Sequence, residues 1–446
     1  MQAKRLWRKL GLTEKYIYLI DRVCSFNFVM QANIDGDLKQ DILRLALDLV
    51  QKRHPLLQMR IRKKSWTTLC FEICQEKIPL RVVDATDEVW INEVENELHK
   101  PLPAERGPLL RCVLFRNCNI RTMMLLTFHH SIGDAMSGVY LIRDLIETSG
   151  RLIRGENVRL TELPLKDPME SYHPGSVRGV SGFFKTVGFF ARSLYNTARW
   201  KNPVLPHIDK KVPLSERRAI IVNREISQEQ MKRLIAGARD HHTTIQGVLA
   251  AACTLAILCE RQKGKQETVM VSSDVNLREI LVPPVKDEIG FFISCVTTIE
   301  KSGQETDFWE LAGTLRGALK SCFAREEPLF FSKIIALSDL FLRLAGTGRF
   351  ASRLYAFNTE WTTPDIFELS NIGALDIEHH YAPLSIKRIG FAASFSATAT
   401  LGLHTSTLNG CMVCNFIGMA PLYSREHIES IADRVIGILS EVWNCP

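Results

Sequence analysis

The hydrophobic positions at the start of the chain alternate between two periods. Residues 26–34, FNFVMQANI, are typical of a strand, and the DGD sequence at 35–37 predicts a turn after it. Residues 38–53 place apolar side chains at the spacing of one helical face, namely at Leu38, Ile42, Leu45, Ala46 and Leu49. Proline then ends this helix, and residues 54–62 predict the next strand. The start of the chain therefore predicts an α/β unit.

A second group of apolar runs surrounds two adjacent histidines. Residues 109–116 and 121–130 predict a pair of strands joined by a short loop. Residues 135–150 then have apolar positions at helical spacing, from Val139 to Ile146. His129 and His130 therefore fall on the bend where a buried strand turns into a helix.

The regular pattern is lost between residues 151 and 213, where prolines and glycines recur. This crossover contains one helical segment, residues 182–200. The second half resumes an α/β rhythm, with strands at 216–226, 268–279, 289–300 and 394–417 and helices at 227–242, 243–262 and 424–443. We predict an α/β chain with an N-terminal lobe at 1–170, a basic crossover at 171–215 and a C-terminal lobe at 216–446.

Length and composition indicate a globular protein. The chain has 446 residues, of which 46% are hydrophobic and 24% charged. No window has the roughly 18 consecutive apolar residues of a membrane span, and no apolar stretch follows the basic N-terminus as in a signal peptide. We predict a cytoplasmic protein whose 12 cysteines are mostly reduced core residues. Cys411 and Cys414 have metal-ligand spacing, but in a strand this offset places them on opposite faces.

The net charge of +7 is unevenly distributed. Residues 176–211 contain seven basic residues and one acidic residue, a net charge of +6. Such a segment favours an anionic partner, either a phosphate-bearing co-substrate or an anionic membrane surface. The sequence lacks the signatures of nucleic-acid binding, so we expect no nucleic-acid partner. The helix at 182–200 either lies on the domain surface or touches lipid, and the sequence leaves both open.

The sequence TFHHSIGDAMSG, residues 127–138, has the strongest candidate chemistry. Histidine is the side chain best suited to accept a proton near neutral pH. At the end of a strand, His129 and His130 point to opposite faces, so only one of them can face a cleft. Asp134 is placed to cap the helix or to pair with an arginine. A metal site is disfavoured because adjacent strand histidines diverge, and the plain alternative is a histidine that serves only the fold.

Competing motifs are absent from the sequence. We find no G-x-S-x-G nucleophile elbow, no phosphate-binding G-x-x-x-x-G-K-[ST] loop, no dinucleotide-binding G-x-G-x-x-G and no H-E-x-x-H.

The segment HHSIGDA resembles the HHxxxDG motif of the acyltransferase superfamily related to chloramphenicol acetyltransferase. That superfamily includes condensation domains of peptide synthetases and free-standing transferases of the phthiocerol/phthiodiolone dimycocerosyl type, which this chain resembles most. The resemblance extends over nearly the whole chain, through residues 29–61, GPLLRCVLF at 107–115, SSDVNLRE at 272–279 and LSNIGAL at 369–375.

The resemblance implies two similar lobes that form a pseudo-dimer, with the active-site tunnel between them. It implies that His130 is the general base, that His129 supports it, and that Asp134 is a structural residue paired with Arg278. The motif's glycine is Ala135 here, which would strain a backbone that needs positive φ. The implied reaction is direct transfer without an acyl-enzyme, and serines and threonines of 394–407 are candidates for the oxyanion donor.

The co-substrate implied is an acyl group on coenzyme A or on the phosphopantetheine of an acyl carrier protein, with no tightly bound cofactor and no metal. The acceptor is a hydroxyl or amine of a lipid, polyketide or peptide-like molecule, with O-acylation preferred. We expect a monomer, with peripheral membrane contact through 176–211 as an additional hypothesis. Two alternatives stay open: a glycerolipid acyltransferase, because His129 and Asp134 also spell HxxxxD, and a non-catalytic domain that binds an acyl carrier, which Ala135 favours.

Overall fold

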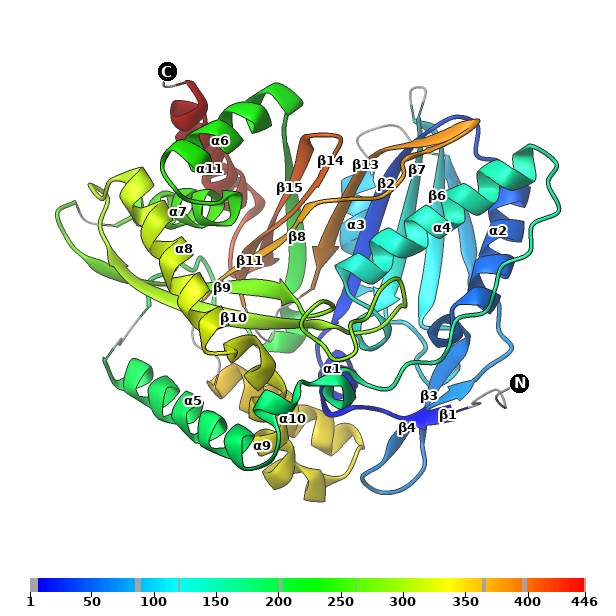
Figure 1. Ribbon diagram of the computed structural model, residues 1–446, viewed down its shortest axis with the longest axis horizontal. Coiled ribbons are helices and arrows are strands. Elements are labelled where there is room, and N and C mark those ends of the chain that lie inside the picture. The colour runs from blue at the N-terminus through cyan, green and yellow to red at the C-terminus, as the bar shows by residue number, and fades with distance from the viewer. Residues whose placement is uncertain are drawn as a thin grey trace.

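The computed structural model describes residues 7–84, 90–118, 121–199, 203–261, 263–362, 366–394 and 399–444. Over these ranges the strands form two six-stranded sheets and one three-stranded sheet (Figure 1). The two larger sheets lie side by side and each is covered by helices, so the chain has two lobes. The predicted α/β class and the two-lobed architecture are confirmed.

The first large sheet is built around the central strand that carries the two histidines. In sheet order its strands are β12 (His380–Tyr381), β13 (Leu384–Ala393), β2 (Asn27–Asp35), β7 (Arg121–His129), β6 (Leu110–Cys118) and β5 (Leu80–Asp84). All neighbours are antiparallel except β5 and β6. In the register of β2 and β7, Asn27 lies opposite His129.

The second large sheet mixes parallel and antiparallel pairs. In sheet order its strands are β10 (Ile293–Ser302), β9 (Glu267–Asn276), β11 (Phe367–Ala374), β14 (Leu401–Leu408), β15 (Cys411–Ala420) and β8 (Arg218–Ile226). The strand pairs β9–β11 and β11–β14 are parallel. Asn409 and Gly410 join β14 to β15 and both have positive φ, which a two-residue hairpin turn of this hand requires.

Helices cover the outer faces of both sheets. On the first sheet, α2 (Gln40–Arg53) and α4 (Ala135–Ile153) pack on one face and α3 (Trp90–His99) on the other. The second sheet is covered by four helices, α6 (Gln228–Asp240), α7 (Ile245–Leu258), α8 (Phe308–Ala324) and α11 (Arg425–Asn444). The capping box predicted for Ser227 and Gln230 at the start of α6 is present.

A third group of elements lies along the lower side of the molecule in Figure 1. It comprises the helices α1 (Leu12–Asp21), α5 (Gly179–Arg199), α9 (Phe331–Leu342) and α10 (Arg349–Thr362) and the small sheet of β1 (Trp7–Lys9), β4 (Leu69–Ile73) and β3 (Met59–Lys63). Helix α1 packs against α9 and α10 on one side and against the bend after β7 on the other. The two histidines are therefore connected to this side of the molecule through one helix.

The lobes are joined where the open edges of their sheets are covered. β13 has only the two-residue β12 as an outer neighbour, and the side chains of Ser406 and Asn415 donate hydrogen bonds to its carbonyl groups at Ile389 and Phe391. β8 is the edge of the second sheet, and its amide groups at Ala219 and Ile221 donate to side chains of α3. Such cover satisfies backbone groups that a sheet edge otherwise leaves unpaired.

The predicted elements agree with the structure in most places where the apolar pattern was regular. The strands predicted at 26–34, 109–116 and 121–130 are β2, β6 and β7, and the helix predicted at 135–150 is α4. Residues 394–417 were predicted as strand-like, and the structure has the hairpin β14–β15 from Leu401 onward. The helix predicted at 182–200 is α5.

The predicted domain ranges do not each correspond to one sheet. β12 and β13 lie within 216–446, but β13 pairs with β2 and β12 with β13, so they complete the sheet of the N-terminal lobe. Strand pairing across more than 350 residues leaves no trace in a local pattern. The division at 170 and 215 and the tunnel between the lobes remain predictions.

Candidate active site

His130 occupies the first position of a short 3-10 helix (His130–Ile132) that links β7 to α4. Its Nδ1 atom lies 2.8 Å from the carbonyl oxygen of Gly133. A carbonyl oxygen can only accept, so Nδ1 carries the proton and Nε2 keeps a free lone pair. The bend therefore holds the ring in the tautomer that a general base needs.

The surroundings of His130 are aromatic. The ring centres of Phe26, Phe28 and Phe291 lie 5.9, 4.8 and 5.2 Å from that of His130. Burial lowers the pKa of His130 to about 4, and the hydrogen bond to Gly133 and the charge of Asp134 oppose the shift only in part. The imidazole is therefore neutral at physiological pH, which is the form a general base must have before it accepts a proton.

His129 has a different environment although it is the adjacent residue. It is fully buried, and its Nδ1 atom accepts from the amide and the hydroxyl of Ser131, at 3.2 and 2.7 Å. Its Nε2 atom faces Asp21 of α1 at 3.4 Å. Both ring nitrogens of His129 are thus turned toward the protein, and the 3-10 turn that begins at His130 directs the second ring elsewhere.

Asp134 and Arg278 meet across the two lobes. Asp134 caps α4 by accepting from the amide of Ser137 at 2.7 Å, and its Oδ1 atom accepts from Arg278 Nη2 at 2.8 Å. Its other oxygen accepts from the amide of Phe292, just before β10, at 2.9 Å. Both charged side chains are buried. The sequence had placed these two residues together only through the family resemblance, and the structure brings them together.

Arg278 also organises the loop before β10. It donates to the carbonyls of Lys286 and Glu288, and its guanidinium lies 4.7 Å from the ring centre of Phe292. This loop delivers Phe291 to the ring of His130. Among the described contacts, Arg278 is connected to His130 only through Asp134 and this loop.

Ala135 is the first residue of α4, where the family motif has glycine. Outside glycine, positive φ occurs within the described ranges only at His242, Glu326 and Asn409. The strain considered from the sequence is therefore absent at Ala135. Alanine is the best helix former at such a position.

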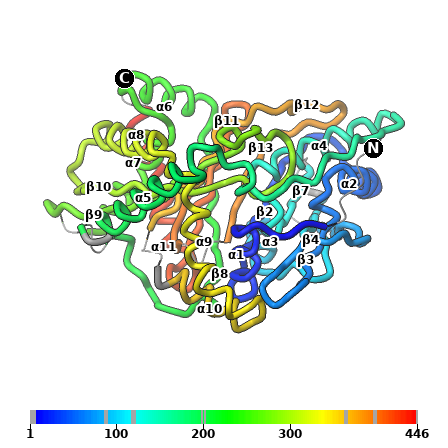
Figure 2. Tube along the Cα trace, turned by 60° about the horizontal axis from the view of Figure 1, so that its bottom comes forward, coloured from blue at the N-terminus to red at the C-terminus, as the bar shows by residue number. Residues whose placement is uncertain are grey.

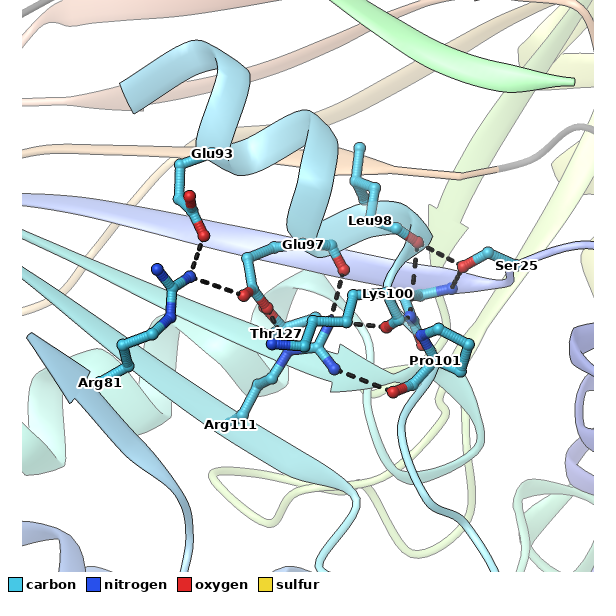
Figure 3. Close-up of polar contacts among 10 residues, drawn as sticks. Ser25, Arg81, Glu93, Glu97, Leu98, Lys100, Pro101, Arg111 and Thr127 are labelled. Carbon is cyan, nitrogen blue, oxygen red and sulfur yellow. Dashed lines mark hydrogen bonds and ion pairs between the residues drawn. The ribbon is translucent and has the colours of Figure 1, made fainter. Parts of the chain in front are cut away.

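A buried ion-pair cluster supports the strand that carries the histidines (Figure 3). Glu97 of α3 accepts from Arg111 of β6, from Arg81 of β5 at 3.1 Å and from Thr127 Oγ1 at 2.9 Å. Burial alone would raise the pKa of Glu97, but the hydrogen bond and charge of Arg111 lower it overall. Thr127 precedes His129 by two residues, so this cluster fixes the end of β7 against α3.

The candidates for an oxyanion donor are not resolved into one residue. Ser396 and Thr398 lie outside the described residues. Ser406 donates to the carbonyl of Ile389, and Thr405 and Thr407 point to the opposite face of β14. No described contact joins any of these side chains to His130.

The sequence did not reveal a second group of polar side chains, which lies partly buried on the sheet of the C-terminal lobe. Asp274 of β9 and Glu368 of β11 lie on one face of adjacent strands, and we call them the carboxyl pair. Burial, followed by the charge of Glu368, raises the pKa of Asp274 to about 7, and burial raises that of Glu368 to about 8. His404 lies 3.3 Å from Glu368, and burial lowers its pKa to about 4. The signal in the sequence was an acid in the middle of an apolar strand, at SSDVN.

No group of three or more metal-ligating side chains occurs among the residues that the structure describes. Cys411 is partly buried, Cys414 is buried, and neither is in a disulfide.

Residues 21–446 match the family described as the condensation domain. One of the proteins of the linear gramicidin synthase of Brevibacillus parabrevis is 23% identical over 97% of the chain, and bacitracin synthase 2 of Bacillus licheniformis is 22% identical over 96%. The chain spans only 5% and 15% of the length of these two relatives.

Solved structures share the fold over the full length. The first condensation domain of the calcium-dependent antibiotic synthetase, in complex with a substrate analogue, gives a TM-score of 0.75 at 15% identity, over 100% of this chain and 98% of that chain. Polyketide synthase associated protein 5 from Mycobacterium tuberculosis gives 0.70 at 17% identity, covering 98% of both chains. Trichothecene 15-O-acetyltransferase from Fusarium sporotrichioides gives 0.71 at 11% identity, over 98% and 95%.

Proposed function

The chain belongs to the condensation domain family, and from this premise we propose that it transfers an acyl group from a thioester to a hydroxyl or amine. The observation that carries the proposal is the environment of His130. Its Nδ1 proton is directed at the Gly133 carbonyl, so the neutral Nε2 atom is left for an acceptor in aromatic surroundings. A buried, neutral imidazole with a fixed tautomer suits general-base catalysis.

The proposed step needs no covalent enzyme intermediate. Nε2 of His130 takes the proton of the acceptor O–H or N–H as its oxygen or nitrogen bonds to the thioester carbon. The tetrahedral oxyanion then collapses, the C–S bond breaks, and the proton passes from His130 to the departing thiolate. Because the pKa of His130 is about 4, the imidazolium is a strong acid that gives up its proton readily to the sulfur.

His129, Asp134 and Arg278 act in this proposal by holding the bend in place. Asp134 fixes the start of α4, and Arg278 fixes both Asp134 and the loop that carries Phe291. His129 anchors the end of β7 to Ser131 and to α1. None of the three needs to touch the substrate.

We propose acyl-coenzyme A or acyl-phosphopantetheine as the donor and a lipid, polyketide or peptide-like alcohol as the acceptor. Two of the structurally similar proteins suit this preference, since one is named a 15-O-acetyltransferase and the other a polyketide synthase associated protein. An acyl carrier protein is the proposed macromolecular partner, because the curated relatives are synthases many times longer than this chain. Monomeric state and cytoplasmic location stay predictions.

The experiment is mass spectrometry of products from the purified chain with a panel of acyl thioesters, alcohols and amines. We expect an acylated product and a stoichiometric release of thiol, both lost in His130→Ala. His207→Ala, which removes an exposed histidine, is the matched control and should retain full turnover. Equal turnover by His130→Ala would refute the mechanism. Binding of an acyl carrier protein without turnover of any donor would favour the non-catalytic alternative.

A further inference from the structure

Three helices on the lower side of the molecule expose apolar side chains where a soluble surface normally has polar ones. On α5, Val180, Phe183, Phe184, Val187 and Leu194 are exposed, and they recur at the spacing of one helical face. The sequence left open whether this helix lies on the domain surface or touches lipid. The structure turns it toward solvent.

The helices α9 and α10 repeat this arrangement. Ile334, Leu337 and Phe341 follow each other at three and four residues on α9, and Phe350 and Phe357 are seven residues apart on α10. Phe341 and Phe350 are each 71% exposed. Leu344, between the two helices, is 80% exposed. Each helix therefore buries one side against the protein and presents an apolar stripe outward.

These elements lie next to one another on this side of the molecule, and we call their exposed apolar side chains together the apolar platform. α5 is held to the segment before α9 by the stacked rings of Phe189 and Phe330. The hairpin of β3 and β4 borders the far side, where exposed Trp66 donates from Nε1 to the carbonyl of Leu344 at 3.1 Å. Figure 1 shows α5, α9 and α10 along the lower side, and Figure 2, in which that side comes forward, shows them spread across it. Exposed apolar side chains gathered on neighbouring elements mark an interaction surface.

The charges around the platform are positive. Arg343, Arg349 and Arg353 are exposed, and none of them pairs with a carboxylate in the part of the chain that the structure describes. The acids of the same helices are turned away or neutralised: Asp339 binds Lys15 at 2.7 Å, and Glu360 binds Arg217 at 2.6 Å. An anionic layer would thus meet arginines without meeting free carboxylates.

The basic crossover itself contributes less of this charge than its sequence suggests. Lys185 of α5 forms an ion pair with Glu326, and Arg192 pairs with Glu327 at 2.8 Å. Helix α5 therefore supplies mainly apolar side chains. The unpaired arginines come from the turn after α9 (Arg343) and from α10 (Arg349 and Arg353). The sequence had assigned membrane contact to 176–211 alone.

We propose that the apolar platform docks on an anionic lipid bilayer, with phenylalanines and Trp66 in the interface and Arg343, Arg349 and Arg353 on the headgroups. Exposed apolar side chains on helices, with basic residues beside them, are the arrangement found in proteins that bind the surface of an anionic bilayer. No single helix among the described residues is long and apolar enough to cross a bilayer, and the one bent pair that passes by length and composition, α6 with α7, is elsewhere. This docking does not depend on the proposed acyl transfer.

The platform is one helix away from the candidate active site. Lys15 and Tyr16 of α1 bond to α9 and α10 through Asp339 and Thr359. The end of the same helix carries Asp21, which faces His129. Docking on a bilayer would bring lipid-dissolved acceptors close to His130.

The test is flotation of the full chain with vesicles of phosphatidylcholine alone or mixed with an equal amount of phosphatidylserine. We expect salt-sensitive binding to the mixed vesicles and at least about tenfold weaker binding to phosphatidylcholine alone. The variant Phe341→Ser with Phe350→Ser should lose about tenfold in affinity, and Arg349→Ala with Arg353→Ala a similar factor together with most of the salt sensitivity. The matched controls are Leu45→Ser on α2 and Arg159→Ala, which remove an exposed leucine and an arginine away from the platform.

The outcomes separate the alternatives. Absence of binding to mixed vesicles, or binding that both platform variants leave unchanged, would overturn the proposal. If the parent chain self-associates and the phenylalanine variant is monomeric without any vesicle binding, the platform is an interface between copies. If an acyl carrier protein binds through these residues while vesicles do not, the partner is a protein. Because all substituted side chains are exposed, the melting temperature of the variants should equal that of the parent. If the serine variant is less stable, the arginine variant still tests the attraction between the arginines and the anionic lipid.

Discussion

The bend after β7 and the carboxyl pair of the second sheet both withdraw carboxyl groups from solvent, fully at the bend and partly in the sheet, but they hold them in opposite ways. At the bend, the carboxylate of Asp134 meets the guanidinium of Arg278 and two amide donors. In the second sheet, no arginine or lysine within the described ranges pairs with Asp274 or Glu368, which have serine and histidine neighbours instead. A buried carboxyl with a cation stays ionised, whereas one without a cation takes up a proton. The carboxyl pair should therefore respond to pH near neutrality.

The largest difference should appear when the two adjacent histidines of the bend are removed separately. We expect His130→Ala to lower kcat by about 10²–10⁴-fold with little change in thermal stability, because a general base contributes this much to the rate. His129→Ala should mainly lower the melting temperature, because it removes the buried anchor to Ser131 and Asp21. Stopped assays and thermal unfolding of both variants provide the measurement. A reversed pattern would exchange the roles assigned to the two residues.

The pH dependence of the reaction tests the same assignment. The pKa of His130 is lowered to about 4, so the base is already deprotonated throughout the neutral range. We expect kcat/KM to be constant from about pH 6 to 8 and to fall only as the pH approaches 4. An acid limb centred near the ordinary histidine pKa of about 6.5 would show that the base is a different, solvated group.

The inter-lobe ion pair should give the largest change in stability. Arg278→Ala leaves Asp134 buried without its cation, and the expected loss is about 3–5 kcal/mol in the free energy of unfolding. Arg278→Lys keeps the charge but cannot reach both Asp134 and the carbonyls of the loop. Its free energy of unfolding should therefore lie between that of the parent and that of Arg278→Ala. Chemical denaturation gives the measurement. A loss below about 1 kcal/mol for Arg278→Ala would mean that the lobes are held together elsewhere.

The carboxyl pair should show a smaller effect that depends on pH. Its pKa values are raised, so the native state holds more protons than the unfolded state between about pH 4 and 8, and stability falls as the pH rises through that window. Glu368→Gln should remove much of this fall, a gain on the order of 1–2 kcal/mol at pH 8 relative to pH 5. Melting temperatures across the window compare the variant with the parent. If the melting temperatures of parent and variant changed with pH in parallel, ionisation of the two carboxyls would not lower the stability of the folded protein.

The smallest expected effect concerns Ala135. Because its backbone is helical, Ala135→Gly should restore the family motif and yet cost about 0.5–1 kcal/mol of stability, with unchanged turnover. Unfolding and activity are measured on the same preparation. A clear rise in turnover would show that alanine at this position restricts the active site.

The sequence predicted the elements that have a regular apolar spacing, such as β7 and α4, and the bend between them, while the roles of His129 and His130 stay predictions. The apolar spacing of residues 38–53 predicted a helix, and α2 is present there. The predicted face was wrong, because the buried apolar side chains are Leu43, Ala46, Leu47 and Val50, whereas Leu45 is exposed. Apolar spacing is a local signal, so the element can be read from it without knowledge of the fold.

The features that the sequence did not predict are non-local or reverse the usual pattern. The pairing of β13 with β2 joins Phe391 to Met30 across the chain, and no periodicity encodes such a partner. Helices α8, α9 and α10 were not predicted, and on α9 and α10 the exposed stripe is itself apolar, so an inward-facing interpretation would have been wrong. Asp274 and Glu368 were missed because a single acid within a strand is usually exposed.

The position of β13 also determines the order in which the molecule can be completed during synthesis. Strands β2, β6 and β7 have all been synthesised by residue 129. The second neighbour of β2, strand β13, is complete only at residue 393. At about 5–20 residues per second, the emerging N-terminal lobe waits on the order of ten to fifty seconds with one strand edge open. During that interval β2 is a site for mispairing with other nascent chains, and a chaperone that covers it would raise the yield of folded protein.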